Sequence, residues 1–207
     1  MKKVAEGFFI VISLVGIWSC SNTMPPGRRA SELADPVVQE RKAKDEAFRQ
    51  GKNSPIPPEQ RAAFRGLAYF PPDPGLRFTV RLQRYSRPEQ VRLGTNTGEI
   101  RLALRYGYFE FQIGDHICRL QVYRLEDAPG SEPYLFIPFR DATSGRETYG
   151  AGRYIDLKEN TTGIYELDFN RAYNPFCAYN EQYSCPLAPE ENTLKVAIRA
   201  GEKIYAP

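Results

Sequence analysis

The chain has 207 residues, of which 42% are hydrophobic and 13% aromatic, which is enough for one domain with a buried core and a tail. Its formal net charge of +3 comes from dispersed lysines and arginines and does not favour a nucleic-acid partner. A single histidine excludes most histidine-based zinc sites and catalytic relays.

The N-terminus has the pattern of a secretory signal peptide. Lys2 and Lys3 precede a short apolar run over residues 7–18, which ends at Ser19 and Cys20. The run is too short for an ordinary membrane-spanning helix, which needs about 20 apolar residues. The four residues IWSC at 17–20 also resemble the lipobox of bacterial lipoproteins, in which the cysteine is acylated, for example with palmitate, and becomes the first residue.

We therefore expect residues 1–19 to be removed and Cys20 to hold the protein to a membrane through its lipid anchor. Residues 20–35 have little to bury and read as a lipidated tether. No acidic run follows Cys20, which favours a periplasm-facing position in the cell envelope, with the outer membrane as the expected address. The alternatives are a plain secreted protein and an uncleaved anchor.

Two short helices are expected at the start of the domain. Asp35 is a good N-cap and Pro36 suits a first helical turn, so the sequence predicts a helix over residues 36–50 that ends at Gly51. A second short helix is predicted from Pro58 to about Phe64.

From residue 77 onward the hydrophobic period is two, which indicates strands with one buried face. Gly114 and Asp115 have the pattern of a two-residue hairpin turn. The predicted strands are 77–83, a strand beginning at 91, 100–106, 109–113, 118–122, 134–139, 153–157, 164–170 and 194–199. The 134–139 run is apolar on both faces and should be central. We expect a mainly β fold over residues 36–207, an antiparallel β-sandwich or partly open barrel in one domain.

Several motifs in this domain resemble those of a known family. They are SPI at 54–56, GLAYFP at 66–71, PFRDATSG at 138–145, ETYGAGRY at 147–154, DFN at 168–170, AYNP at 172–175, CAY at 177–179, SCP at 184–186 and EN at 191–192. On these motifs the chain is similar to a bacterial family known as domain of unknown function 1684. Ala151 stands where that family usually has a glycine. The resemblance implies a self-contained domain and supplies no activity.

Charged, hydroxyl and aromatic residues gather on glycine-framed loops between residues 140 and 179, which predicts a site for a small polar or anionic ligand. In this hypothesis Arg140 and Arg153 hold the anion, and Ser144, Tyr149 and Asn174 orient it. The full set of candidate ligand-binding residues is Arg140, Asp141, Ser144, Glu147, Tyr149, Arg153, Asp168 and Asn174.

Two other hypotheses fit the same residues. The first is a hydrolase that uses Asp141, Glu147 or Asp168 as a general acid or base. The second is a purely structural lipoprotein, in which Asp141 hydrogen-bonds its own loop and Arg153 forms an ion pair with Asp168 or Glu147.

Cys177 and Cys185 are eight positions apart, and in an oxidising envelope they are candidates for a disulfide. Unpaired packing thiols, a metal site and a nucleophilic cysteine are the alternatives, in that order, and we predict no metal site. Cys118 shares the parity of core residues, and His116 beside the hairpin turn should be exposed. The sequence identifies neither a cofactor nor an oligomeric state.

Overall fold

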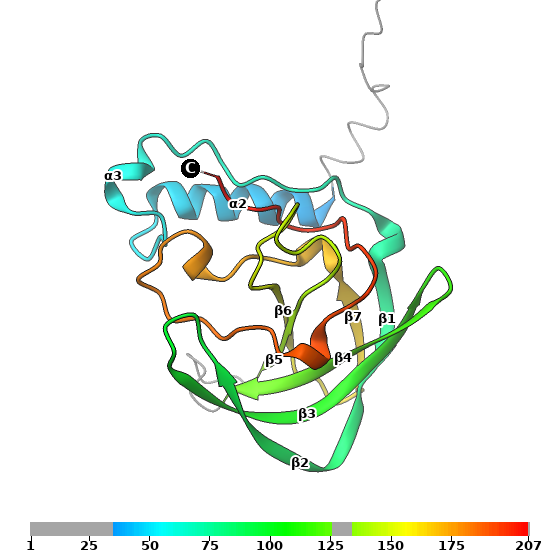
Figure 1. The fold of residues 1–207 in the computed structure, drawn as a ribbon. Coiled ribbons are helices and arrows are strands. Elements are labelled where there is room, and N and C mark those ends of the chain that lie inside the picture. Colours follow the sequence, from blue (N-terminus) through cyan, green and yellow to red (C-terminus); the bar gives the residue numbers. More distant parts are fainter. Residues whose placement is uncertain (1–34, 126–133, 207) are drawn as a thin grey trace, which may run out of the picture.

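The computed structural model describes residues 35–125 and 134–206 (Figure 1). Its larger sheet is antiparallel, with five strands in the order β2-β3-β4-β5-β6. These are β2 (Gln83–Gly94), β3 (Ile100–Ile113), β4 (His116–Leu125), β5 (Tyr134–Phe139) and β6 (Arg153–Lys158). A second antiparallel sheet pairs β1 (Arg77–Arg81) with β7 (Ile164–Asp168). The predicted mainly β, antiparallel fold is confirmed.

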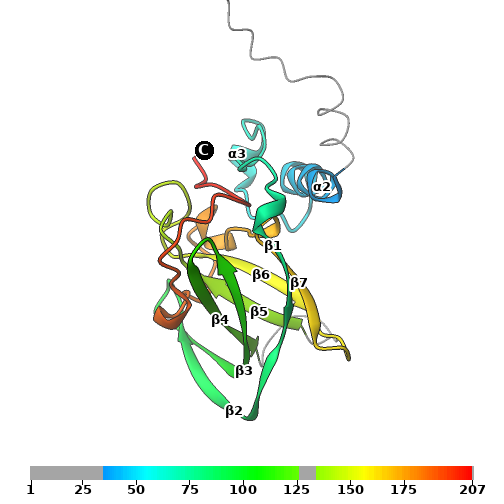
Figure 2. The same ribbon diagram turned by 90° about the vertical axis from the view of Figure 1, so that its right-hand side faces the viewer.

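The core lies between these two sheets. The β1–β7 pair stands beside the larger sheet, and β1 contacts β3 while β7 contacts β6 (Figure 2). Phe109, Leu120, Ile137, Leu167 and Phe169 are fully buried in this core. The two sheets remain separate over the described residues, so the fold is an open sandwich and not a closed barrel.

The period-two pattern places most strands correctly. The two predicted strands over residues 100–113 form one continuous strand, β3, with a bulge between Arg105 and Gly107. A Cβ atom on Gly107 would lie 2.4 Å from the carbonyl oxygen of Gln83, so the close approach of β2 requires glycine there. Gly114 has a φ of +55° in the hairpin turn, as the sequence indicates.

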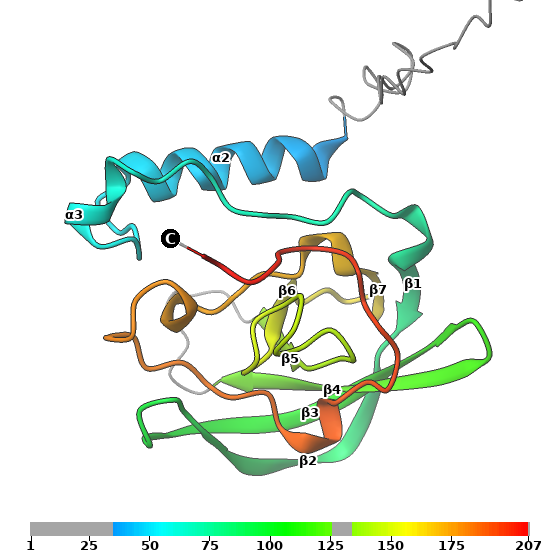
Figure 3. The same ribbon diagram turned by 45° about the horizontal axis from the view of Figure 1, so that its top comes forward.

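The predicted first helix is α2 (Pro36–Gln50), and its bounds are confirmed. Asp35 caps it, because the Val37 amide donates to its Oδ1 atom at 2.9 Å. The helix lies across one end of the sandwich, with the C-terminal segment between it and the strands (Figure 3). Only Val37 and Phe48 are buried on it. The second helix, α3 (Pro58–Arg61), is shorter than predicted.

Short 3-10 turns complete the described chain: η1 (Pro74–Leu76), η2 (Phe169–Arg171), η3 (Phe176–Ala178) and η4 (Glu190–Asn192). Among the described residues, no helix has the length and apolar character that a membrane crossing requires. The predicted signal peptide, Cys20 and the tether lie outside the described residues, except for Asp35.

The predicted strand over residues 194–199 is wrong, since this segment is irregular. It runs beside the loop after β5, and the Leu194 amide donates to the Arg140 carbonyl at 2.8 Å. Further along, the carbonyls of Ile198 and Ala200 accept from the side chain of Arg153 instead of from a neighbouring strand. An alternating apolar pattern does not reveal that a side chain replaces the strand partner.

Candidate functional site

The centre of the predicted site is a buried ion pair. Arg153, the first residue of β6, is fully buried, and its Nη2 atom lies 2.9 Å from Asp141 Oδ2. The same guanidinium donates to the backbone carbonyls of Ile198 (2.9 Å), Glu202 (3.1 Å) and Ala200. Burial lowers the pKa of Arg153, and the charge of Asp141 opposes that shift. Arg153 therefore holds the C-terminal segment in place. The predicted ion pair of Arg153 with Asp168 or Glu147 is wrong, because its partner is Asp141.

Asp141 also organises its own loop. Its Oδ1 atom accepts from the Thr143 amide and hydroxyl, each at 2.7 Å, and from the Ile198 amide at 3.2 Å. The amides of Ser144 and Gly145 donate inward to carbonyl oxygens. These two amides are therefore not available to an anion, and ligand contacts at this turn would come from side chains.

Two further predicted residues are occupied within the fold. Asp168 accepts from Arg77 Nε at 3.0 Å and from the amide of Asn170 at 2.9 Å. Asn174 donates its side-chain amide to the carbonyl of Lys203 at 2.8 Å, while its Oδ1 atom is buried without a hydrogen-bond partner. Both Asp168 and Asn174 are buried, so they support loop architecture.

Glu147 and Tyr149 lie at the rim of the loop. Arg199 Nη2 lies 2.9 Å from Glu147 Oε1, and this hydrogen-bonded ion pair lowers the pKa of Glu147. The Tyr149 hydroxyl lies 3.7 Å from the Cys177 sulfur, and burial raises the pKa of this tyrosine to about 12.

The remaining candidates line an open groove of about 620 Å³ beside the loop. Its lining residues are Arg140, Asp141, Ser144, Gly150, Glu190, Thr193 and Lys195. The Arg140 Nε atom is buried without a hydrogen-bond partner, and no described residue pairs with the charge of Lys195. Ser144 Oγ accepts from the Asp141 amide at 3.1 Å, which leaves its hydroxyl hydrogen available. The eight predicted residues thus do not share one hollow: Arg140, Asp141 and Ser144 line this groove, whereas Tyr149 lines a different pocket beside Cys177.

Cys177 and Cys185 come together as predicted but are free thiols in the structure. The Cys177 amide donates to Cys185 Sγ at 3.3 Å. A hydrogen bond from the Cys177 thiol lowers the pKa of Cys185 to about 7, and the same bond raises the pKa of Cys177. The disulfide remains a prediction. Cys118 is buried, as expected, and His116 is exposed.

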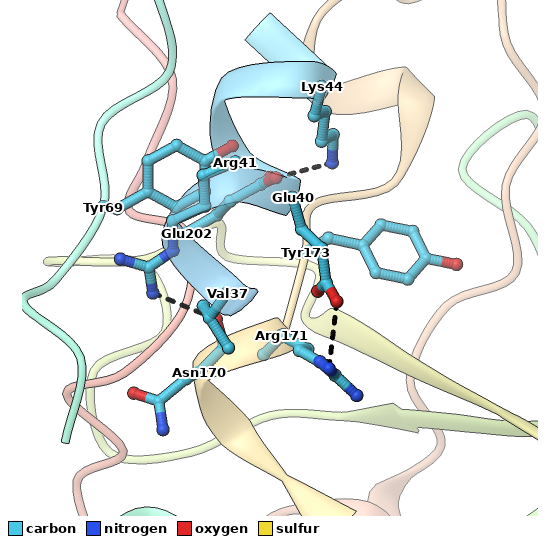
Figure 4. A pocket seen from close by; sticks show the side chains of 10 residues that line it. Val37, Glu40, Arg41, Lys44, Tyr69, Asn170, Arg171, Tyr173 and Glu202 are labelled. Atoms are coloured by element: carbon cyan, nitrogen blue, oxygen red, sulfur yellow. Dashed lines mark hydrogen bonds and ion pairs between the residues drawn. The ribbon is translucent and has the colours of Figure 1, made fainter. Parts of the chain in front are cut away.

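A second cavity, which the sequence does not indicate, lies between α2 and the sandwich (Figure 4). One face of α2, with Val37, Glu40, Arg41 and Lys44, forms a wall of it. The opposite wall consists of Tyr69, residues 170–173 and Glu202. These positions are i, i+3, i+4 and i+7 on one helix face, but charged residues with that spacing usually indicate a solvated face. Among the described residues, no group of three or more histidine, cysteine or acidic side chains is placed to hold a metal ion.

Comparisons with known proteins place the chain in a family. The family model described as "Protein of unknown function (DUF1684)" matches residues 62–203. The chain is also 37% identical to an uncharacterized protein from gene locus rrnAC0354 of Haloarcula marismortui, known from a solution NMR structure. That match has a TM-score of 0.64 and covers 85% of this chain and 96% of the other. No curated protein matches this chain. The chain belongs to the DUF1684 family.

Proposed function

We propose that this protein is an envelope lipoprotein, anchored through Cys20, whose domain binds a small oxyanion in the groove beside Arg140. The signal-peptide pattern and the IWSC motif support the address. The observation that carries the binding is the Arg140 Nε atom, which is buried without a hydrogen-bond partner.

A buried donor without an acceptor costs free energy, and an oxyanion in the groove would supply the missing acceptor. Arginine suits this role because its planar fork matches carboxylate and phosphate geometry. Lys195 adds a second positive charge from the segment after η4, and Ser144 adds a hydroxyl donor from the turn. These three side chains come from two separated parts of the chain, so the groove exists only in the folded domain.

The geometry gives less support to the two alternatives. Acid–base hydrolysis would use Asp141, Glu147 or Asp168, and each of these carboxylates is already in an ion pair with an arginine. A purely structural role accounts for the buried Arg153–Asp141 pair but leaves the open, unpaired end at Arg140 without a purpose.

Binding is tested by titrating the protein with inorganic phosphate and measuring the dissociation constant by calorimetry. Replacing Arg140 with methionine removes the main contact. The dissociation constant for phosphate should rise about 10- to 100-fold, which corresponds to the loss of one hydrogen bond between charged groups. Arg146→Met is the matched control, because Arg146 is an exposed cation on the same loop that bonds the Ala142 carbonyl. Equal affinities of the wild type and the Arg140→Met variant would contradict the proposal.

The address is tested separately in cells supplied with labelled palmitate. We expect the label on the wild-type protein and its recovery with membranes, whereas Cys20→Ala should carry no label and leave the membrane fraction. A labelled Cys20→Ala protein would show that the anchor is not at this cysteine. Neither result affects the phosphate titration.

A further inference from the structure

We infer that the cavity between α2 and the sandwich is a second binding site, which takes a small monocarboxylate. This inference is independent of the groove at Arg140, because the cavity and the groove have no lining residue in common. It rests on three observations: unpaired donors, unbalanced charge and size.

Two hydrogen-bond donors at the cavity have no acceptor. Arg41 Nε and the Tyr69 hydroxyl are both buried and unpartnered, and both residues line the cavity. The two residues are also in contact with each other, since the guanidinium carbon of Arg41 lies 4.6 Å from the centre of the Tyr69 ring. A carboxylate has two acceptor oxygens, one for each of these donors.

The charges around the cavity do not balance. Lys44 Nζ lies 2.5 Å from Glu202 Oε1, and Arg171 Nη2 lies 2.9 Å from Glu40 Oε1, so these four side chains form two ion pairs (Figure 4). Glu202 is fully committed, because it also accepts from the Asn174 amide and the Tyr179 hydroxyl.

Arg41 is the cation left over. Its Nη1 and Nη2 atoms donate to the carbonyls of Phe70 (2.8 Å) and Asn170 (3.0 Å), which are neutral groups. Burial lowers its pKa, which reflects the cost of keeping this cation half-buried, and the charges of Glu202, Asp168 and Asp35 offset that shift only in part. One negative charge in the cavity would offset that cost, and a monoanion supplies it.

The size and the remaining walls select a carboxylate with a short carbon chain. The cavity holds about 150 Å³, which is smaller than the pockets of drug-sized ligands. Val37 on the α2 wall, and Ala172 and the ring of Tyr173 on the other wall, add apolar surface to the cavity. A carboxylate such as propionate would place its two oxygens at Arg41 and Tyr69 and its carbon chain against these apolar groups.

The test is a titration of the full chain with sodium propionate, followed by NMR shifts of backbone amides. We expect saturable shifts at α2 and residues 170–173, separate from any shifts at the Arg140 groove, at concentrations of about 1–10 mM for a ligand of so few atoms. Sodium chloride and propylamine at the same concentrations should leave those amides unshifted. Absence of propionate shifts beyond those of sodium chloride would mean that water alone satisfies the two donors and would overturn the inference.

Two tyrosine variants supply the decisive comparison. Tyr69→Phe removes a hydroxyl that has no partner in the fold, so it leaves the structure intact and should weaken propionate binding about tenfold. Tyr173→Phe is the control: its ring lines the cavity, but its hydroxyl donates to Asp156 at 2.6 Å and points away (Figure 4). Equal losses in both variants, or none in Tyr69→Phe, would overturn the assignment. Arg140→Met should leave the propionate shifts unchanged, which separates this site from the groove.

Discussion

At the scale of single residues, Arg153 shows how a charged side chain replaces a strand. The carbonyls of residues 198, 200 and 202 project toward the body of the domain, where an ordinary sheet would offer amide donors. One guanidinium satisfies all three and pairs with Asp141 as well. Lysine has neither the fork nor the number of fixed donors to do this.

We predict that Arg153→Met lowers the free energy of unfolding by about 3–5 kcal/mol, because it leaves Asp141 charged and buried without its cation. Urea unfolding measures the change. Arg140→Met is the control, since Arg140 is half-buried and its Nε has no partner to lose. A loss of stability in Arg153→Met no larger than that in Arg140→Met would show that the buried pair does not hold the C-terminal segment.

At the scale of elements, the sequence predicts what depends on local pattern. The alternation of apolar residues places β1, β3 and β4, the run that is apolar on both faces places β5, and the Asp35-Pro36 pair places the start of α2. It fails over residues 194–199, where the apolar alternation is present but the hydrogen-bond partner is a distant arginine. The partner of Arg153 could not be read from spacing, since Asp141, Glu147 and Asp168 are equivalent until the loops are placed.

The loop that carries η3 brings two cysteines together, and we predict that Cys185 is the reactive one. Because the hydrogen bond from Cys177 lowers its pKa to about 7, Cys185 becomes a thiolate as the pH rises through about 7, below the ordinary range of a thiol. Alkylation by iodoacetamide, followed by mass spectrometry, should therefore reach half its maximal rate near that pH. Cys177→Ala should move the midpoint upward, since it removes the donor.

Cys118 on β4 is the internal control, because burial raises its pKa and no thiol lies beside it in the described structure. In a glutathione disulfide buffer, Cys177 and Cys185 should each lose a hydrogen atom and form one disulfide while glutathione disulfide is reduced. If Cys185 is alkylated no faster than Cys118 near pH 7, this account of the cysteine pair is wrong.

At the scale of the whole molecule, both proposed binding sites of the open sandwich lie outside the core. The groove at Arg140 lies where the loop after β5 meets the segment after η4, and the cavity at Arg41 lies under α2. The sequence identifies the first because Arg140 and Ser144 are close in the chain. It misses the second because Arg41, Tyr69 and Glu202 meet only when α2 and the C-terminal segment pack against the sandwich.

The central claim is that this DUF1684 domain binds an oxyanion at Arg140. The most direct test is to locate bound inorganic phosphate by NMR chemical-shift mapping of the full chain. We predict saturable shifts at the amides of residues 140–150 and 193–195, which vanish in Arg140→Met and persist in Arg146→Met. Phosphate shifts scattered over the surface, or shifts at the groove that are the same in Arg140→Met, would contradict it.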